Sequence, residues 1–189
     1  MMTTRRPLIL ASTSPRRQFL MKEAGYVFRV VAPKSDERFP DFMPAEMVPR
    51  FIAEEKAKPF KVTLRDEWVI TADTVVILRG QILNKPRNRQ EAIQMLSELA
   101  GKTHKVITAV CILSAEKQDL FDDSTKVTFR KLTEKEIEYY VDTCQPFDKA
   151  GAYGAQDWLG MIGIEKINGS YFTVMGMPMH KVYTHLRDY

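Results

Sequence analysis

A short apolar run joined directly to a helical pattern sets the architecture of this chain. Leu8–Ala11 is wholly apolar, as expected for a buried strand. After three hydroxyl residues, the stretch 15–24 has the pattern of a helix, and Gly25 is suited to end it. A second extended run at 27–32 follows. Strands and helices that alternate at this spacing are typical of mixed α/β proteins.

The same alternation continues to the end of the chain. The pattern predicts helices over 44–58, 88–100, 133–143 and 179–186, and extended runs over 68–71, 74–78, 81–84, 104–114 and 121–130. Pro49 lies within the first of these helices, so that helix begins or bends there. The glycine-punctuated stretch 151–176 reads as loops and strands. With 189 residues, 44% of them hydrophobic, the chain can form one well-buried core, and we expect a single domain over 1–189.

The charge balance suits a small anionic substrate at least as well as a nucleic acid. Lys and Arg number 28 against 24 Asp and Glu, a net charge of +4, which is mild compared with the dense basic patches of dedicated nucleic-acid binders. We therefore do not expect a nucleic-acid partner. No run approaches the ~18 apolar residues of a membrane helix, so no membrane association is expected. Two cysteines, Cys111 and Cys144, predict reduced thiols and a cytoplasmic location.

The joint between the first strand and the first helix concentrates groups that bind anions. Ser12, Thr13 or Ser14 can cap the helix, and Pro15 suits its first position. Backbone N–H groups and the helix dipole favour an anion at this end, and Arg16 and Arg17 add forked donors that match phosphate oxygens. The stretch predicts a phosphate-binding site. The alternative is an ordinary capped helix with two solvated arginines.

Carboxylates are the candidates for proton transfer, because the sequence shows no Ser-His-Asp set and no pair of histidines at metal-ligand spacing. Asp73 interrupts the apolar, β-branched stretch VITADTVVIL, where a carboxylate is costly to bury without a partner. A turn-capping aspartate is the alternative. Glu37 lies in a polar loop and is a weaker candidate, since it can be simply solvated. Lys56 and Lys85 are individually weak, with surface lysines as the alternative.

The late segment DKAGAYGAQ combines glycines with Gln156. Repeated glycine permits close approach of the backbone to a ligand, although it also suits plain tight turns. The amide of Gln156 offers both a donor and an acceptor to the edge of a nucleobase.

Taken together, these stretches resemble the Maf family of nucleoside triphosphate pyrophosphatases, also described as septum-formation inhibitors. The matching pieces, in family order, are LILASTSPRR, the Glu37 loop, AEEKAK, TADTVV, LNKP, KVTFRKLTEKEIEYYV, DKAGAYGAQ and KINGSYFTVMGMP. They span almost the whole chain. The chain looks most like the branch acting on dTTP and UTP, in which the positions matching Arg16, Thr74 and Gln156 shape base choice.

The resemblance implies an elongated, two-lobed ITPase-like fold around a central cleft, often dimeric, with a mixed sheet and flanking helices. It implies a divalent cation, Mg²⁺ or Mn²⁺, and cleavage between the α- and β-phosphates. Asp73 would be the general base, and Glu37 would assist it through the metal. Lys56 and Lys85 would complete the catalytic set. The triphosphate would be held by Ser12, Arg16, Arg17, Lys56 and Lys85.

The same resemblance leaves two alternatives and several departures. The alternatives are the sister branch acting on 7-methyl-GTP and a non-catalytic nucleotide or nucleic-acid binder that regulates septum formation. An aspartate beside a triphosphate argues against the pure binder, because like charges repel. The departures are Pro49 in the usual helix pattern, Ala155 in place of a common isoleucine, and Asp157, where relatives usually have glycine after the glutamine. An acidic group beside a base pocket is expected to repel phosphate or to alter base preference.

Overall fold

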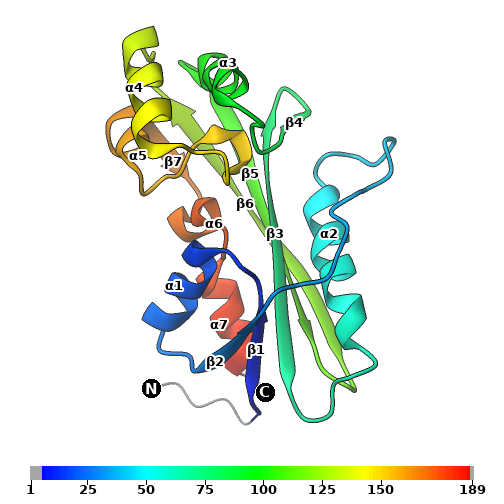
Figure 1. Cartoon of the computed structure of the whole chain (residues 1–189). Coiled ribbons are helices and arrows are strands. Elements are labelled where there is room, and N and C mark those ends of the chain that lie inside the picture. The colour runs from blue at the N-terminus through cyan, green and yellow to red at the C-terminus, as the bar shows by residue number, and fades with distance from the viewer. Residues whose placement is uncertain (1–5, 188–189) are drawn as a thin grey trace. The chain divides into compact units, whose positions relative to one another are not determined.

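The computed structural model describes residues 6–187 and has a mixed α/β architecture, as predicted (Figure 1). Within those residues one mixed sheet has the strand order β2-β1-β3-β5-β6-β7, and β4 pairs with β3. The strands are β1 Leu8–Ala11, β2 Phe28–Val31, β3 Trp68–Leu78, β4 Gln81–Leu83, β5 Thr103–Leu113, β6 Gln118–Phe129 and β7 Ile164–Asn168.

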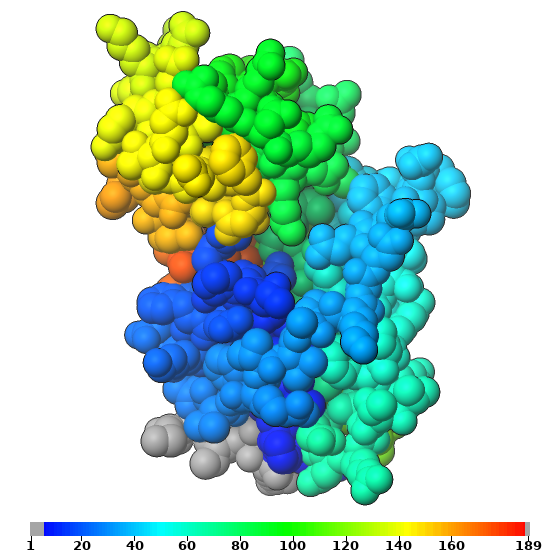
Figure 2. All heavy atoms as spheres, viewed as in Figure 1, coloured from blue at the N-terminus to red at the C-terminus, as the bar shows by residue number. Residues whose placement is uncertain are grey.

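Parallel and antiparallel pairings both occur in the sheet. Strand β1 runs parallel to β2 and to β3, whereas β3–β4 and β6–β7 are antiparallel. Parallel neighbours need a crossover connection. A helix lies in the connection from β1 to β2, and another lies in the connection from β2 to β3, which passes to the other side of β1. Strand β2 forms an edge, and its segment lies at the surface of the view in Figure 2 (blue).

The helices confirm most of the sequence-based predictions. They are α1 Pro15–Glu23, α2 Val48–Ala57, the 3-10 turn η1 Lys58–Phe60, α3 Arg89–Leu99, α4 Glu134–Cys144, the 3-10 turn η2 Ala150–Ala152, α5 Trp158–Gly163, α6 Tyr171–Met175 and α7 Met179–Arg187. None of them is long and apolar enough to cross a membrane within residues 6–187. Pro49 lies in the first turn of α2, so the helix begins there and does not bend.

Two local expectations were wrong. Helices α5 and α6 lie in the stretch predicted to hold only loops and strands, and at 6 and 5 residues they are too short to show a helical period. The second concerns β3, which runs without a break from Trp68 to Leu78. Asp73 therefore lies inside a strand, and the alternative of a turn-capping aspartate does not hold.

The described chain divides into two compact units. Unit 1 contains residues 6–73, 108–123 and 176–187, and unit 2 contains residues 74–107 and 124–175. Strands β3, β5 and β6 each contribute residues to both units. Whether the chain unfolds as the single domain expected from its sequence stays a prediction.

Each unit has its own buried core. In unit 1, apolar residues of α2 pack against alternate residues of β5, with Ala53, Ala57, Ala109, Cys111 and Leu113 all buried. In unit 2, the helices α3, α4 and α5 lie beside one another (Figure 1) and share one core with the strands. Its buried members include Leu96, Leu99, Val127, Phe129, Tyr140 and Leu159.

Candidate active site

The turn from β1 into α1 is built around a buried serine. Strand β1 is buried along its whole length, and Ser12 directly after it is buried too. The Ser12 Oγ accepts a hydrogen bond from the Ser14 N–H at 3.2 Å, and its carbonyl oxygen accepts one from Gln18 Nε2 at 3.2 Å. Ser14 is the N-cap residue, but its side chain makes no capping hydrogen bond. The local structure is the helix start that the sequence predicted.

The two arginines of α1 are both half-buried. Arg17 Nε donates a 2.9 Å hydrogen bond to the carbonyl oxygen of Gly176. This bond fixes the guanidinium against a segment of unit 1 that is far away in the sequence. Burial lowers the pKa of Arg17, and the nearby Asp73 carboxylate opposes that effect. Arginine stays protonated at neutral pH despite such shifts. Arg17 is thus a positively charged side chain whose position is fixed by a hydrogen bond. The alternative, in which both arginines are solvated, is wrong for Arg17.

Lys56 joins two carboxylates of unit 1. Its Nζ lies 2.8 Å from Glu37 Oε1 and 2.8 Å from Asp73 Oδ1. Lys56 comes from the last turn of α2, Glu37 from the segment between β2 and α2, and Asp73 from β3. Only 5% of Lys56 is exposed, so the reading of a surface lysine is wrong. A buried ammonium requires such partners, because an unpaired charge is costly to desolvate.

The Asp73 carboxylate is under opposing electrostatic influences. Burial raises its pKa above the ordinary range, while the positive charges of Lys56 and Arg17 lower it. Burial is the larger effect, so the carboxylate is a stronger base than a solvated aspartate. The cluster of Arg17, Glu37, Lys56 and Asp73 therefore combines two cations with two carboxylates.

The remaining predicted site residues belong to unit 2. Thr74 follows Asp73 in β3 and is half-buried, and Lys85 is exposed after the end of β4. Gln156 lies in a tight turn closed by the hydrogen bond from Asp157 N–H to Gly154 O at 3.1 Å. Its Oε1 is buried and has no hydrogen-bond partner among the residues that the structure describes. Buried acceptors normally have a donor, so this position suits a ligand N–H.

Sequence reasoning missed the surroundings of that turn. Tyr140 of α4 donates a 2.8 Å hydrogen bond to Asp157 Oδ2 and accepts one from the Gly154 N–H at 3.2 Å. Lys149 Nζ lies 3.7 Å from the same Asp157 oxygen. In the sequence Tyr140 is one of several apolar positions on a helix, and nothing in that pattern indicates where its hydroxyl points.

The donor set for a divalent cation is small. Residues 6–187 contain no group of three or more His, Cys, Asp or Glu side chains placed to hold a metal. Glu37 and Asp73, which share the Lys56 ammonium, are the carboxylates that the cluster offers. Mg²⁺ is commonly held by one or two carboxylates together with substrate phosphates, so these two residues fit such a role.

The fold is that of an α/β protein, and its site places cationic groups at the start of α1 near two carboxylates, a set of groups that suits a phosphorylated ligand. The chain belongs to the Maf-like protein family, whose model matches residues 7–189. The resemblance drawn from its motifs is therefore confirmed.

Individual relatives agree with the family assignment. A "dTTP/UTP pyrophosphatase" of Phocaeicola vulgatus is 47% identical over 182 residues, which is 95% of this chain and 94% of that protein. One of Bacteroides fragilis is 49% identical over 184 residues, covering 96% and 95%. Among solved structures, the Ham1 protein of Staphylococcus aureus matches with a TM-score of 0.46 and 16% identity, over 66% of this chain and 72% of that one.

Proposed function

We propose that this protein hydrolyses dTTP and UTP between their α- and β-phosphates, releasing a nucleoside monophosphate and pyrophosphate and so clearing nucleotides from the pool. Relatives bearing the name dTTP/UTP pyrophosphatase, 47% and 49% identical over 95% of the chain or more, support this substrate class. The observation that carries the chemistry is the buried Lys56, which holds Glu37 and Asp73 together.

The phosphate groups are bound by Ser12, Arg16, Arg17, Lys56 and Lys85 in this proposal. Phosphoryl transfer requires that the charge on the phosphate oxygens be neutralised and the phosphorus be held in line with its attacker. The start of α1 offers its dipole to an anion. The bond from Arg17 to Gly176 orients the guanidinium before substrate arrives, which lowers the entropic cost of binding.

Asp73 acts as the general base. A water oxygen attacks the α-phosphorus, its proton passes to the Asp73 carboxylate, and the bond from the α-phosphorus to the bridging oxygen breaks as pyrophosphate leaves. The raised pKa of Asp73 makes it a better proton acceptor at neutral pH. Lys56 holds the Asp73 carboxylate in place, and its second ion pair holds Glu37 close to Asp73.

Glu37, with Asp73 beside it, would hold a divalent cation. Hard oxygen ligands of this kind suit Mg²⁺ or Mn²⁺. When bound, such an ion supplies positive charge that neutralises and orients the phosphates.

Base choice is assigned to Gln156, with Arg16 and Thr74 contributing. The unpaired Oε1 of Gln156 suits the N3–H of thymine or uracil, which lies between two carbonyl groups. Cytosine presents an acceptor at N3 and would leave two acceptors face to face, which costs far more than the thymine methyl group, worth ~1–3 kcal/mol. The enzyme is therefore expected to accept thymine and uracil nucleotides and to discriminate against cytosine nucleotides.

The deciding experiment is pyrophosphate release by the purified protein with Mg²⁺ or Mn²⁺. The substrates are dTTP, UTP, CTP, GTP, ATP and 7-methyl-GTP. Preferential release from dTTP and UTP is expected. Preference for 7-methyl-GTP would keep the chemistry and overturn the base assignment, and folded protein inactive on all six would favour the non-catalytic binder. We further propose a homodimer that works in the cytoplasm, which sedimentation and cell fractionation can test.

A further inference from the structure

One tyrosine hydroxyl closes both ends of the turn that carries Gln156. The turn runs from Gly154 to Asp157, with Gln156 at its third position. The Tyr140 hydroxyl accepts the Gly154 N–H at 3.2 Å and donates to Asp157 Oδ2 at 2.8 Å. It is therefore bonded to the backbone two residues before Gln156 and to the side chain one residue after it.

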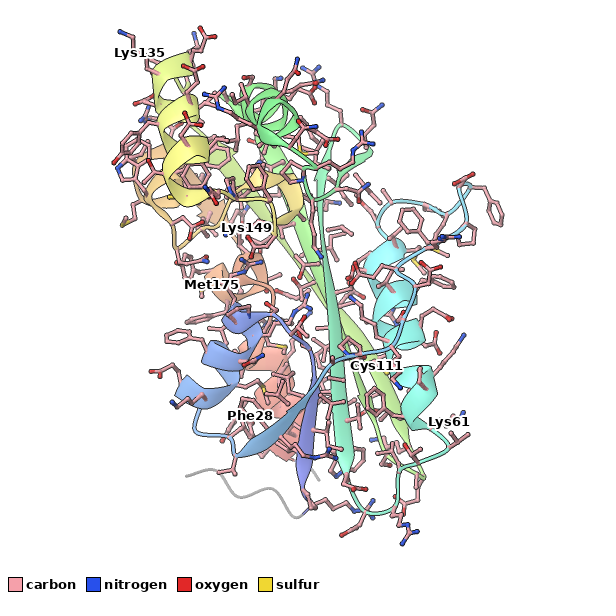
Figure 3. All side chains as sticks on the ribbon, viewed as in Figure 1. Phe28, Lys61, Cys111, Lys135, Lys149 and Met175 are labelled. Atoms are coloured by element: carbon pink, nitrogen blue, oxygen red, sulfur yellow. The ribbon has the colours of Figure 1, made fainter. Side chains whose placement is uncertain are left out.

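The surrounding residues leave the turn little freedom. A Cβ on residue 154 would lie 2.6 Å from Asp157 Oδ2, so glycine is needed for the carboxylate to reach its position. A Cβ on residue 160 would lie 2.1 Å from the Ala155 carbonyl oxygen, so Gly160 lets α5 pack directly on the backbone of the turn. Lys149, labelled in Figure 3, places its ammonium 3.7 Å from the Asp157 carboxylate.

The Asp157 carboxylate is thus mostly covered by other residues of the protein. It faces a tyrosine hydroxyl and a lysine, and 19% of the side chain is exposed. Burial, with the Asp157 carboxylate as a further cause, raises the pKa of Tyr140, which keeps the hydroxyl protonated and able to donate. Asp157, at which this chain departs from the family pattern, is therefore bonded to Tyr140 of α4.

We infer that Tyr140 and Asp157 are positioning residues for base recognition: their hydrogen bond fixes the turn so that the Gln156 amide meets the pyrimidine edge in one orientation. The inference rests on the proposed function. It predicts that the pair governs discrimination between UTP and CTP more than the rate of bond cleavage, because neither side chain is part of the cluster around Asp73.

The test compares kcat/KM for UTP and CTP in folded variants. Tyr140→Phe and Asp157→Ala each remove the hydrogen bond, and the UTP-to-CTP ratio is expected to fall about tenfold or more, since a small misplacement of a recognition group has effects of that order. Asp157→Asn retains an acceptor for the Tyr140 hydroxyl and should stay near the wild-type ratio. Tyr139→Phe is the matched control, because it removes a hydroxyl from the neighbouring exposed tyrosine.

A second measurement separates positioning from general destabilisation. In the double variant Tyr140→Phe/Asp157→Ala, the loss in the ratio should be smaller than the sum of the two single-variant losses, because the Tyr140–Asp157 hydrogen bond is lost in both single variants. Equal losses on UTP and CTP, with an unchanged ratio, would mean that the pair is merely structural and would overturn the inference. Absence of UTP hydrolysis by the wild-type protein would instead overturn the proposed function, and this inference with it.

Discussion

At the scale of single residues, a substitution of Asp73 is the most direct test of the proposed mechanism. Asp73→Asn keeps the shape of the side chain but cannot accept a proton, so we expect kcat for UTP to fall about 10²–10⁴-fold. Lys56 retains Glu37 as a partner, and nucleotide binding should stay measurable. Steady-state pyrophosphate release and calorimetric binding of UTP check the two halves of this prediction.

The control for that experiment is Asp66→Asn. Asp66 is an exposed aspartate just before β3 that pairs with Arg6 at 3.3 Å, so the same chemical change there should leave kcat unaltered. An Asp73→Asn enzyme with wild-type turnover would remove Asp73 from the role of base.

His104 is a buried residue that should make stability depend on pH. Only 2% of it is exposed, its Nε2 is 2.6 Å from the Tyr153 hydroxyl, and burial lowers its pKa to about 4. The unfolded chain binds a proton near the ordinary value of 6.5, so stability is lost as pH falls from 6.5 to 4, by about 3 kcal/mol in all. Urea unfolding at pH 7 and at pH 4.5 measures this loss.

His104→Gln provides the comparison, because glutamine can still bond to Tyr153 and does not titrate in this range. The variant should lose less stability than wild type between the two pH values. His180→Gln, at a half-exposed position, should behave like wild type. Identical pH dependence in all three proteins would contradict the assignment to His104.

Residue-level predictions from the sequence succeeded where a side chain is unusual for its surroundings. Asp73 stands out within an apolar stretch, and the structure gives it the cationic partners that its burial demands. Lys56 looked ordinary, because its partners lie 19 residues before it and 17 after it in the numbering. Tyr140 gave no signal at all, since only the fold brings its hydroxyl to Gly154 and Asp157.

At the scale of elements, the start of α4 is a capping box whose contribution to the free energy of unfolding can be measured. Thr133 Oγ1 accepts from the Glu136 N–H, and the Glu136 carboxylate accepts from the Thr133 N–H at 2.8 Å. Thr133→Ala should lower the free energy of unfolding by about 1 kcal/mol. Thr143→Ala, at an exposed position in the last turn of the same helix, should be neutral or slightly stabilising.

The same box should weaken in acid. Hydrogen bonds from Arg130 and from the Thr133 N–H lower the pKa of Glu136 to about 2, against 4.5 ordinarily. Its contribution is therefore present above pH 4.5 and is lost as pH falls toward 2. The difference in unfolding free energy between Glu136→Ala and wild type should shrink over that range, and a constant difference would show that the Glu136 charge takes no part.

Element predictions depended on length and on caps. Helix α4 was found from its capping box and α3 from its 3.6-residue period, whereas α5 and α6 were missed because one turn or so of helix shows no period. The single strand β3 was split into two because Asp73 resembles a turn residue in isolation. Burial of that carboxylate beside Lys56 allows the strand to continue.

At the scale of the whole molecule, the two tryptophans report on the two units separately. Trp68 belongs to unit 1 and Trp158 to unit 2. Because β3, β5 and β6 contribute to both units, we expect fluorescence transitions in urea to coincide for the variants Trp68→Phe and Trp158→Phe. Far-UV circular dichroism of the same samples should follow the same curve. Two separate midpoints would contradict the expectation of one cooperative domain over 1–189.

The way in which the chain is divided between the units also bears on how this gene can change. Unit 1 is assembled from three separate stretches and unit 2 from two, so the segment 108–123 of unit 1 is encoded inside the region that encodes unit 2. No single recombination point can exchange one unit intact. Substitution within this framework is therefore a more direct route to a new substrate preference than exchange of a whole unit.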